Sequence, residues 1–127
     1  MSNADNQYQA GACNIGPSEI HRRYQVAIVG ATIYLILSFL LLSSHETSVI
    51  RLTAFIPAMI ASVGYVQARR RFCLAYGFAG LVNFGRAGDV SKIADPAALA
   101  ADRAYAFKVL FIALIPALLM TGVIYFL

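Results

Sequence analysis

The sequence predicts an all-α membrane protein: a helical hairpin of two transmembrane helices, a short interfacial or re-entrant helix, and a third long transmembrane helix. The first reason is composition, since 60% of the 127 residues are hydrophobic and only 13% are charged. A soluble domain this small could not bury so much apolar surface, because its surface-to-volume ratio is too high. The second reason is that three segments are long and apolar enough to cross a bilayer, with basic residues beside them.

The N-terminal part of the chain predicts a flexible tail followed by the first transmembrane helix. Residues 1–12 are polar, so we expect a mobile tail there and a single membrane domain from residue 13 to 127. Pro17 suits the first turn of a helix, and Glu19 complements the positive end of the helix dipole. The 21 residues 24–44 carry no formal charge and are the first predicted span.

A second span follows after a short polar link, so the first two spans are expected to form a hairpin. This span covers residues 49–68, and Pro57 near its middle predicts a kink. Arg51 stands in its first turn, from where it can reach the lipid headgroups. Small residues let membrane helices approach closely, and we expect Gly30 and Gly64 to serve such packing.

The apolar stretch after the second span is too short to cross a membrane. Residues 72–84 therefore predict a short helix that lies at the interface or folds back against the hairpin. Gly77 and Gly80 permit close contact with another helix, and Gly85 can take the left-handed conformation that ends a helix. We expect residues 85–95 to form a loop on the cytoplasmic side.

The last part of the chain predicts one long helix. Asp95 is expected as its N-cap with Pro96 in its first turn, and Pro116 as a site of kinking. Residues 107–127 are the third predicted span. A helix continuous from Pro96 to Phe126 would be roughly 46 Å long, which exceeds the hydrocarbon thickness, so its first turns should project beyond it.

The basic residues predict the orientation. Nine of the ten Lys and Arg residues flank one side of the predicted spans, and only Arg51 lies on the other. By the positive-inside rule the N-terminus and residues 69–104 are cytoplasmic and the C-terminus is outside. The basic collars are also expected to contact anionic lipid headgroups. The residues concerned are Arg22, Arg23, Arg69, Arg70 and Arg71. Because no basic stripe with interleaved aromatic residues is present, we expect no nucleic-acid partner.

Enzymatic motifs are absent from the sequence, which contains no Gly-rich phosphate loop, HExxH or CxxC. We therefore expect no catalytic site, no cofactor and no metal site, since two Cys and His21 leave a tetrahedral site one ligand short. Cys13 and Cys73 should meet at the cytoplasmic face, where a permanent disulfide is not expected. Nearby arginines and helix starts lower the pKa of a thiol, so the choice lies between a reactive thiol pair and two inert, semi-buried residues.

Two fragments of the sequence resemble the YgaP-like inner-membrane domain, a rhodanese-associated bacterial family. CNIGPSEIHRR (13–23) resembles the opening of that domain, and FCLAYGFAGL (72–81) resembles its ending. Covering about residues 12–85, the resemblance implies a two-span hairpin, dimerisation through the spans and a link to sulfur or thiol chemistry. The 127 residues contain no rhodanese domain, have Leu74 where the family has a proline, and add a third span. Sulfurtransferase activity therefore does not carry over, and both cysteines match only as positions of unknown role.

These observations leave two functional hypotheses. The first is a non-enzymatic scaffold or accessory subunit in the bacterial inner membrane, which packs in the lipid bilayer as a homo-oligomer or within a larger membrane complex. The alternative is a cytoplasmic-face module for thiol redox or sulfur relay that uses Cys13 and Cys73. A small transporter is least favoured, because no ionisable residue stands near the middle of any predicted span.

Overall fold

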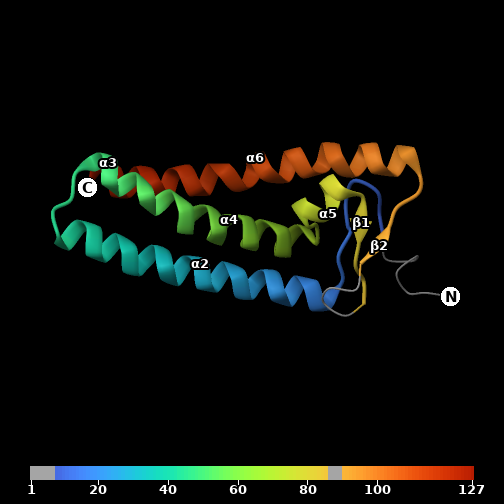
Figure 1. The fold of residues 1–127 in the computed structure, drawn as a ribbon, viewed down its shortest axis with the longest axis horizontal. Helices are drawn as coiled ribbons and strands as arrows, with labels where there is room; N and C mark the ends of the chain where they lie inside the picture. Colours follow the sequence, from blue (N-terminus) through green and yellow to red (C-terminus); the bar gives the residue numbers. More distant parts are fainter. Residues whose placement is uncertain (1–7, 86–89) are drawn as a thin grey trace.

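Three long helices lie side by side and make up most of the molecule (Figure 1). The computed structural model describes residues 8–85 and 90–127. Its long helices are α2 (Pro17–Ser43), α4 (Phe55–Arg70) and α6 (Pro96–Phe126), with α4 in contact with both others. Three helical segments, Pro17–Ser43, Ser48–Arg70 and Pro96–Phe126, are long and apolar enough to cross a membrane. The predicted fold class is therefore confirmed, and the molecule is a multi-pass membrane protein.

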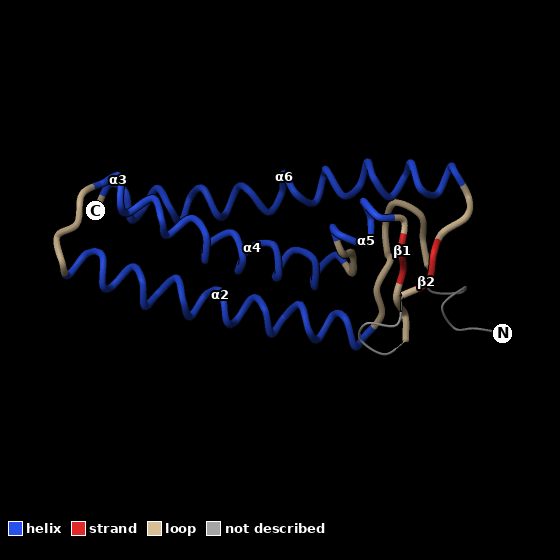
Figure 2. Tube along the Cα trace, viewed as in Figure 1, coloured by secondary structure: helices blue, strands red, loops and turns tan. Residues whose placement is uncertain are grey.

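The shorter elements lie at the two ends of the bundle (Figure 2). At one end are α3 (Ser48–Arg51) and the 3₁₀ helix η1 (Leu52–Ala54). At the other are α5 (Leu74–Ala79), β1 (Leu81–Val82) and β2 (Ser91–Lys92). We call this second end the polar end and define it as the described residues 8–23, 67–85 and 90–105. Arg51 and the C-terminus lie at the opposite end of the bundle (Figure 1).

The first span confirms the predicted helix start. Gly16 is the N-cap of α2, Pro17 occupies the first turn and Glu19 also lies in that turn. The helix therefore begins seven residues before the predicted span of 24–44 and ends at Ser43. A side chain at Gly16 would clash with the backbone of Phe84, because a Cβ there would lie 2.9 Å from the Cα of Phe84.

The second span is interrupted earlier than the sequence predicts. The helix that begins at Ser48 tightens into η1 before α4 starts at Phe55. Pro57 has no N–H to donate to the carbonyl of Thr53, four residues earlier, so the irregular turn falls before the proline rather than at it. Arg51 does not simply reach out to headgroups: its Nη1 donates to the carbonyl of Ile124 in α6, at 3.4 Å.

The predicted helix over 72–84 is wrong in its length. Only α5, a helix of six residues, forms there, and the chain then continues into β1. Gly80 adopts a left-handed conformation with φ of 76° and ends the helix at Ala79, so Gly85 is not the stop. β1 pairs with β2 in an antiparallel register that places Leu81 opposite Lys92.

The described residues of the two regions predicted as tail and loop make specific contacts. Residues 1–7 and 86–89 lie outside the described residues, but residues 8–12 are not a free tail. The N–H of Gln9 donates to the carbonyl of Cys13 at 3.0 Å, and further contacts hold this segment against α6. Within the predicted loop of 85–95, Ser91 and Lys92 form β2.

The last helix begins as the sequence predicts. The Asp95 side chain accepts from the N–H of Ala97 at 3.3 Å, and Pro96 occupies the first turn. α6 continues over 31 residues and includes both Pro116 and most of the third predicted span, 107–127. Its length of about 46 Å exceeds a hydrocarbon thickness of about 30 Å, which leaves its first turns for the polar end.

The α2–α4 contact depends on two glycines. A Cβ on Gly30 would lie 2.6 Å from the backbone N of Ala61, and one on Gly64 would lie 2.9 Å from the backbone N of Ala27. Each glycine therefore lets the backbones of the two helices touch, as expected for close packing between membrane helices.

We predict that Gly30→Ala lowers the stability of the folded protein, because one of the two helix backbones must move away. Overpacking of this kind typically costs about 1–3 kcal/mol. Gly122→Ala is the matched control, since a Cβ at Gly122 meets nothing within 4 Å. Thermal unfolding in detergent, followed by circular dichroism, should show a lower midpoint for Gly30→Ala only. Equal midpoints would show that this contact is not tight.

Candidate functional site

Both cysteines and the five arginines singled out by the sequence lie at the polar end, which contains two neighbouring features. The first, which we call the buried polar cluster, joins the N-terminal segment, α2, α5 and β1. Its members are Asn14, Glu19, Arg23, Cys73, Tyr76 and Asn83. The second, which we call the basic pocket, is a cavity of about 930 Å³ between the N-terminal segment and the ends of α2 and α4.

Asn14 connects three segments of the chain. It is fully buried, and its side chain accepts from the N–H of Cys73 at 2.7 Å and donates to the Cys73 carbonyl at 3.2 Å. Its backbone N–H donates to the carbonyl of Arg71, and its carbonyl accepts from the N–H of Asn83. Asn14 thus ties the N-terminal segment both to the end of α4 and to the residue after β1. No recognised motif in the sequence marks Asn14 for this role.

Glu19 is a carboxylate with no exposed surface. Arg23, one turn along α2, places Nη2 3.0 Å from its Oε2. Tyr76 of α5 donates to Oε2 at 3.3 Å, and Asn83 donates to Oε1 at 3.4 Å. The position in the first turn of α2 adds the favourable field of the helix N-terminus. A buried charge is tolerated only when it is paired and hydrogen-bonded in this way, so Glu19 draws α2, α5 and β1 together.

The two cysteines are free and have different surroundings. Arg23 Nη2 donates to the Sγ of Cys73 at 3.1 Å, and this thiol is buried. The half-buried thiol of Cys13 donates to the carbonyl of Ile15, with Sγ and O 3.6 Å apart. Burial raises the pKa of the Cys13 thiol, and the positive charge of Arg71 offsets only part of that rise. This direction favours the inert alternative for Cys13.

Asp102 holds the N-terminal segment against α6. It is fully buried in α6 and accepts from the N–H of Gly11 at 2.7 Å and from the hydroxyl of Tyr8 at 2.8 Å. Burial and the Asp102 carboxylate raise the pKa of Tyr8, so the phenol remains a proton donor. A charged residue in the first turns of a helix is expected to be solvated, whereas Asp102 is fully buried. Its spacing from Ala98 and Ala106, four residues to each side on the buried face of α6, is the signal that could have identified it.

The glycines of α5 pack inside the chain. A Cβ on Gly77 would lie 2.6 Å from the ring of Phe72 and 3.1 Å from the Cβ of Ala106 in α6. A Cβ on Gly80 would lie 2.5 Å from Leu99, also in α6. α5 therefore folds back against α6 instead of lying alone on the membrane surface.

The basic pocket separates the five predicted arginines into two groups. Arg69, Arg70 and Arg71 line it, whereas Arg22 and Arg23 pair with Glu19. His21 and Cys13 also contribute to its wall, and Cys73 does not. Within residues 8–85 and 90–127, no group of three or more His, Cys, Asp or Glu side chains is placed to hold a metal ion.

We predict that Arg23→Gln destabilises the protein strongly and that Arg22→Gln does not. Arg23 is 15% exposed and 3.0 Å from the buried carboxylate, whereas Arg22 is 59% exposed and 4.0 Å away. Breaking a buried pair typically costs about 3–5 kcal/mol, and an exposed pair contributes about 0–1 kcal/mol. Unfolding midpoints of the two variants in the same detergent measure the difference. Similar midpoints would mean that Arg23 is not the partner on which Glu19 depends.

No protein-family model matches this chain, and no curated protein or solved structure matches it. The resemblance of residues 12–85 to the YgaP-like domain therefore stays a prediction, together with what it implies.

Proposed function

We propose that this chain is a non-enzymatic integral membrane protein that acts as a scaffold or as an accessory subunit of a membrane complex. The observation that supports this most directly is the use of its buried polar side chains. Asn14, Glu19 and Asp102 have no exposed surface, and each joins different segments of the polar end. A catalytic carboxylate has to reach its substrate. These groups instead fix the shape of a platform at one end of the bundle.

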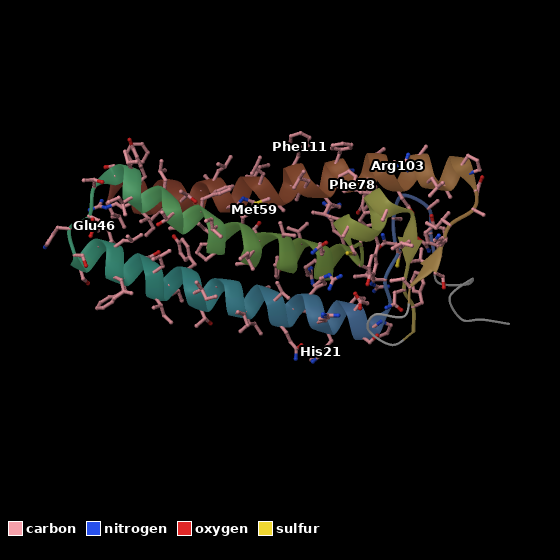
Figure 3. All side chains as sticks on the ribbon, viewed as in Figure 1. His21, Glu46, Met59, Phe78, Arg103 and Phe111 are labelled. Carbon is pink, nitrogen blue, oxygen red and sulfur yellow. The ribbon has the colours of Figure 1, made fainter. Side chains whose placement is uncertain are left out.

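The outer faces of the long helices suit a bilayer or the helices of a partner. Large apolar side chains point outward from both outer helices, with Phe39 of α2 70% exposed and Phe111 of α6 63% exposed. Figure 3 shows Phe111 on the side of α6 that faces away from α4. Contact with lipid removes these side chains from water. A second copy of the chain or another membrane protein could cover part of the same surface, which is how the proposed subunit would assemble.

We place the protein in the bacterial cytoplasmic membrane with its polar end in the cytoplasm. The support is the charge distribution, since the described basic residues other than Arg51 belong to the polar end or to the α6 segment beside it. A fluorescent protein that matures only in the cytoplasm should be bright when fused before Met1 and dark when fused after Leu127. A bright C-terminal fusion would reverse the proposed orientation.

The thiol module remains the second candidate, and one contact favours it. The guanidinium of Arg23 donates to the Sγ of Cys73, which places a positive group beside this thiol. Against it stand the burial of Cys73 and the raised pKa of Cys13. The two thiols also have separate partners, with Cys13 facing the basic pocket and Cys73 facing Arg23.

The two candidates predict different behaviour of a variant that carries both Cys13→Ser and Cys73→Ser. Under the scaffold proposal, native mass spectrometry of the tagged protein, released from its membrane in mild detergent, shows the same assembly with and without the cysteines. That assembly is either an oligomer of this chain or a complex with another membrane protein in a fixed ratio. A monomer in both preparations would contradict the scaffold proposal, and an assembly lost only in the serine variant would favour the thiol module.

A further inference from the structure

The basic pocket has the size and position of a ligand site at the membrane boundary. Its volume of about 930 Å³ is within the range of pockets that hold small molecules. Its wall includes Ile20 and Tyr24 of α2 and Ala68 of α4. Tyr24 also meets Tyr65 of α4 edge to face, with 6.4 Å between the ring centres. Paired tyrosines at the end of a span are typical of the headgroup region, so the pocket opens at the depth where lipid headgroups lie.

The described residues that form the wall of the pocket include arginines but no acidic residue, so the pocket is positively charged. Arg69, Arg70, Arg71 and His21 line it. The nearest buried carboxylate of α2, Glu19, is already paired with Arg23 and is not part of the wall. The N-terminal end of α2, at Gly16 and Pro17, adds the partial positive charge of the helix dipole.

The three arginines are held in different ways. Arg70 Nη1 donates to the hydroxyl of Tyr105 at 3.1 Å, which positions its guanidinium and leaves other N–H groups to bind a ligand. Within residues 8–85 and 90–127, the side chains of Arg69 and Arg71 make no hydrogen bond or ion pair. Arg71 is also fixed at its backbone, where φ is 54° and the carbonyl accepts from Asn14.

We propose that the basic pocket binds the phosphate-bearing headgroup of an anionic membrane lipid. Planar guanidinium groups donate pairs of hydrogen bonds to phosphate oxygens, and the helix N-terminus favours the same negative charge. The lipid is favoured over a free phosphate because the pocket lies beside Tyr24 and Ile20, at the start of the apolar part of α2. This inference goes beyond a general basic collar, because it assigns the ligand to Arg69–Arg71 and not to Arg22 and Arg23. It holds whether or not the protein is a scaffold.

The test is a lipid titration of the purified, delipidated full chain by native mass spectrometry. Dioleoyl-phosphatidylglycerol should bind at one site about tenfold or more tightly than dioleoyl-phosphatidylcholine, which has the same chains but no net charge. Arg69→Gln combined with Arg71→Asn should remove this preference, and asparagine tolerates the left-handed backbone at position 71. Arg103→Gln combined with Lys108→Gln is the matched control, because it removes the same charge from exposed positions outside the pocket.

A second measurement leaves the arginines unchanged. Cys13 lies in the pocket wall, so in a Cys73→Ser background bound phosphatidylglycerol should slow the reaction of Cys13 with N-ethylmaleimide, and phosphatidylcholine should not. Equal binding of the two lipids, or equal loss in both double variants, would overturn the proposal. Protection of Cys13 by inorganic phosphate but not by phosphatidylglycerol would overturn the lipid assignment and identify a soluble phosphate compound as the ligand.

Discussion

The buried charge of Glu19 is the constraint on which the polar end depends. A carboxylate taken out of water loses several kcal/mol of hydration, so its oxygens must be met by charged and polar partners. Three of these partners come from different places in the chain: Arg23 from α2, Tyr76 from α5 and Asn83 from the residue after β1. Arg23 in turn donates to Cys73, at the N-cap of α5. Satisfying one carboxylate therefore fixes the positions of α5 and β1 against the start of α2.

The same pairing explains why five arginines at one membrane face do not have one role. Arg22 and Arg23 are three and four residues from Glu19 on the same helix, so both can approach its carboxylate, and Arg23 forms the close, buried pair. The arginines that end α4 have no acid among the described residues of the pocket wall, and their positive charge remains available. A charge count along the sequence assigns all five to a lipid-facing collar. Only the structure separates Arg23, which is buried against Glu19, from the exposed Arg22 and from the three arginines that line a cavity.

The parts of the fold that were predicted correctly depend on local signals. Composition and segment length identify the three spans, and Asp95 followed by Pro96 identifies the start of α6, because each signal acts within a few residues. The parts that were missed depend on contacts between distant residues. Tyr8 and Asp102 are 94 positions apart, and nothing near residue 8 indicates that its segment is held in place. The length of α5 was misjudged because an apolar run does not reveal that Gly80 takes a left-handed conformation against Leu99.

The length of α6 explains why short elements pack around its first turns at the polar end. A helix of 31 residues is about 16 Å longer than a hydrocarbon core of about 30 Å, which corresponds to roughly its first eleven residues. In these turns Ala98, Asp102 and Ala106 are buried. The covering is supplied by short elements: Gly80 contacts Leu99, Gly11 contacts Asp102, and Gly77 contacts Ala106. The N-terminal segment and α5 are thus the structures that bury the projecting part of α6. Buried backbone groups of these short segments lack the regular hydrogen bonds of a long helix, so side chains have to supply partners. Asn14 of the buried polar cluster does this for both the N–H and the carbonyl of Cys73.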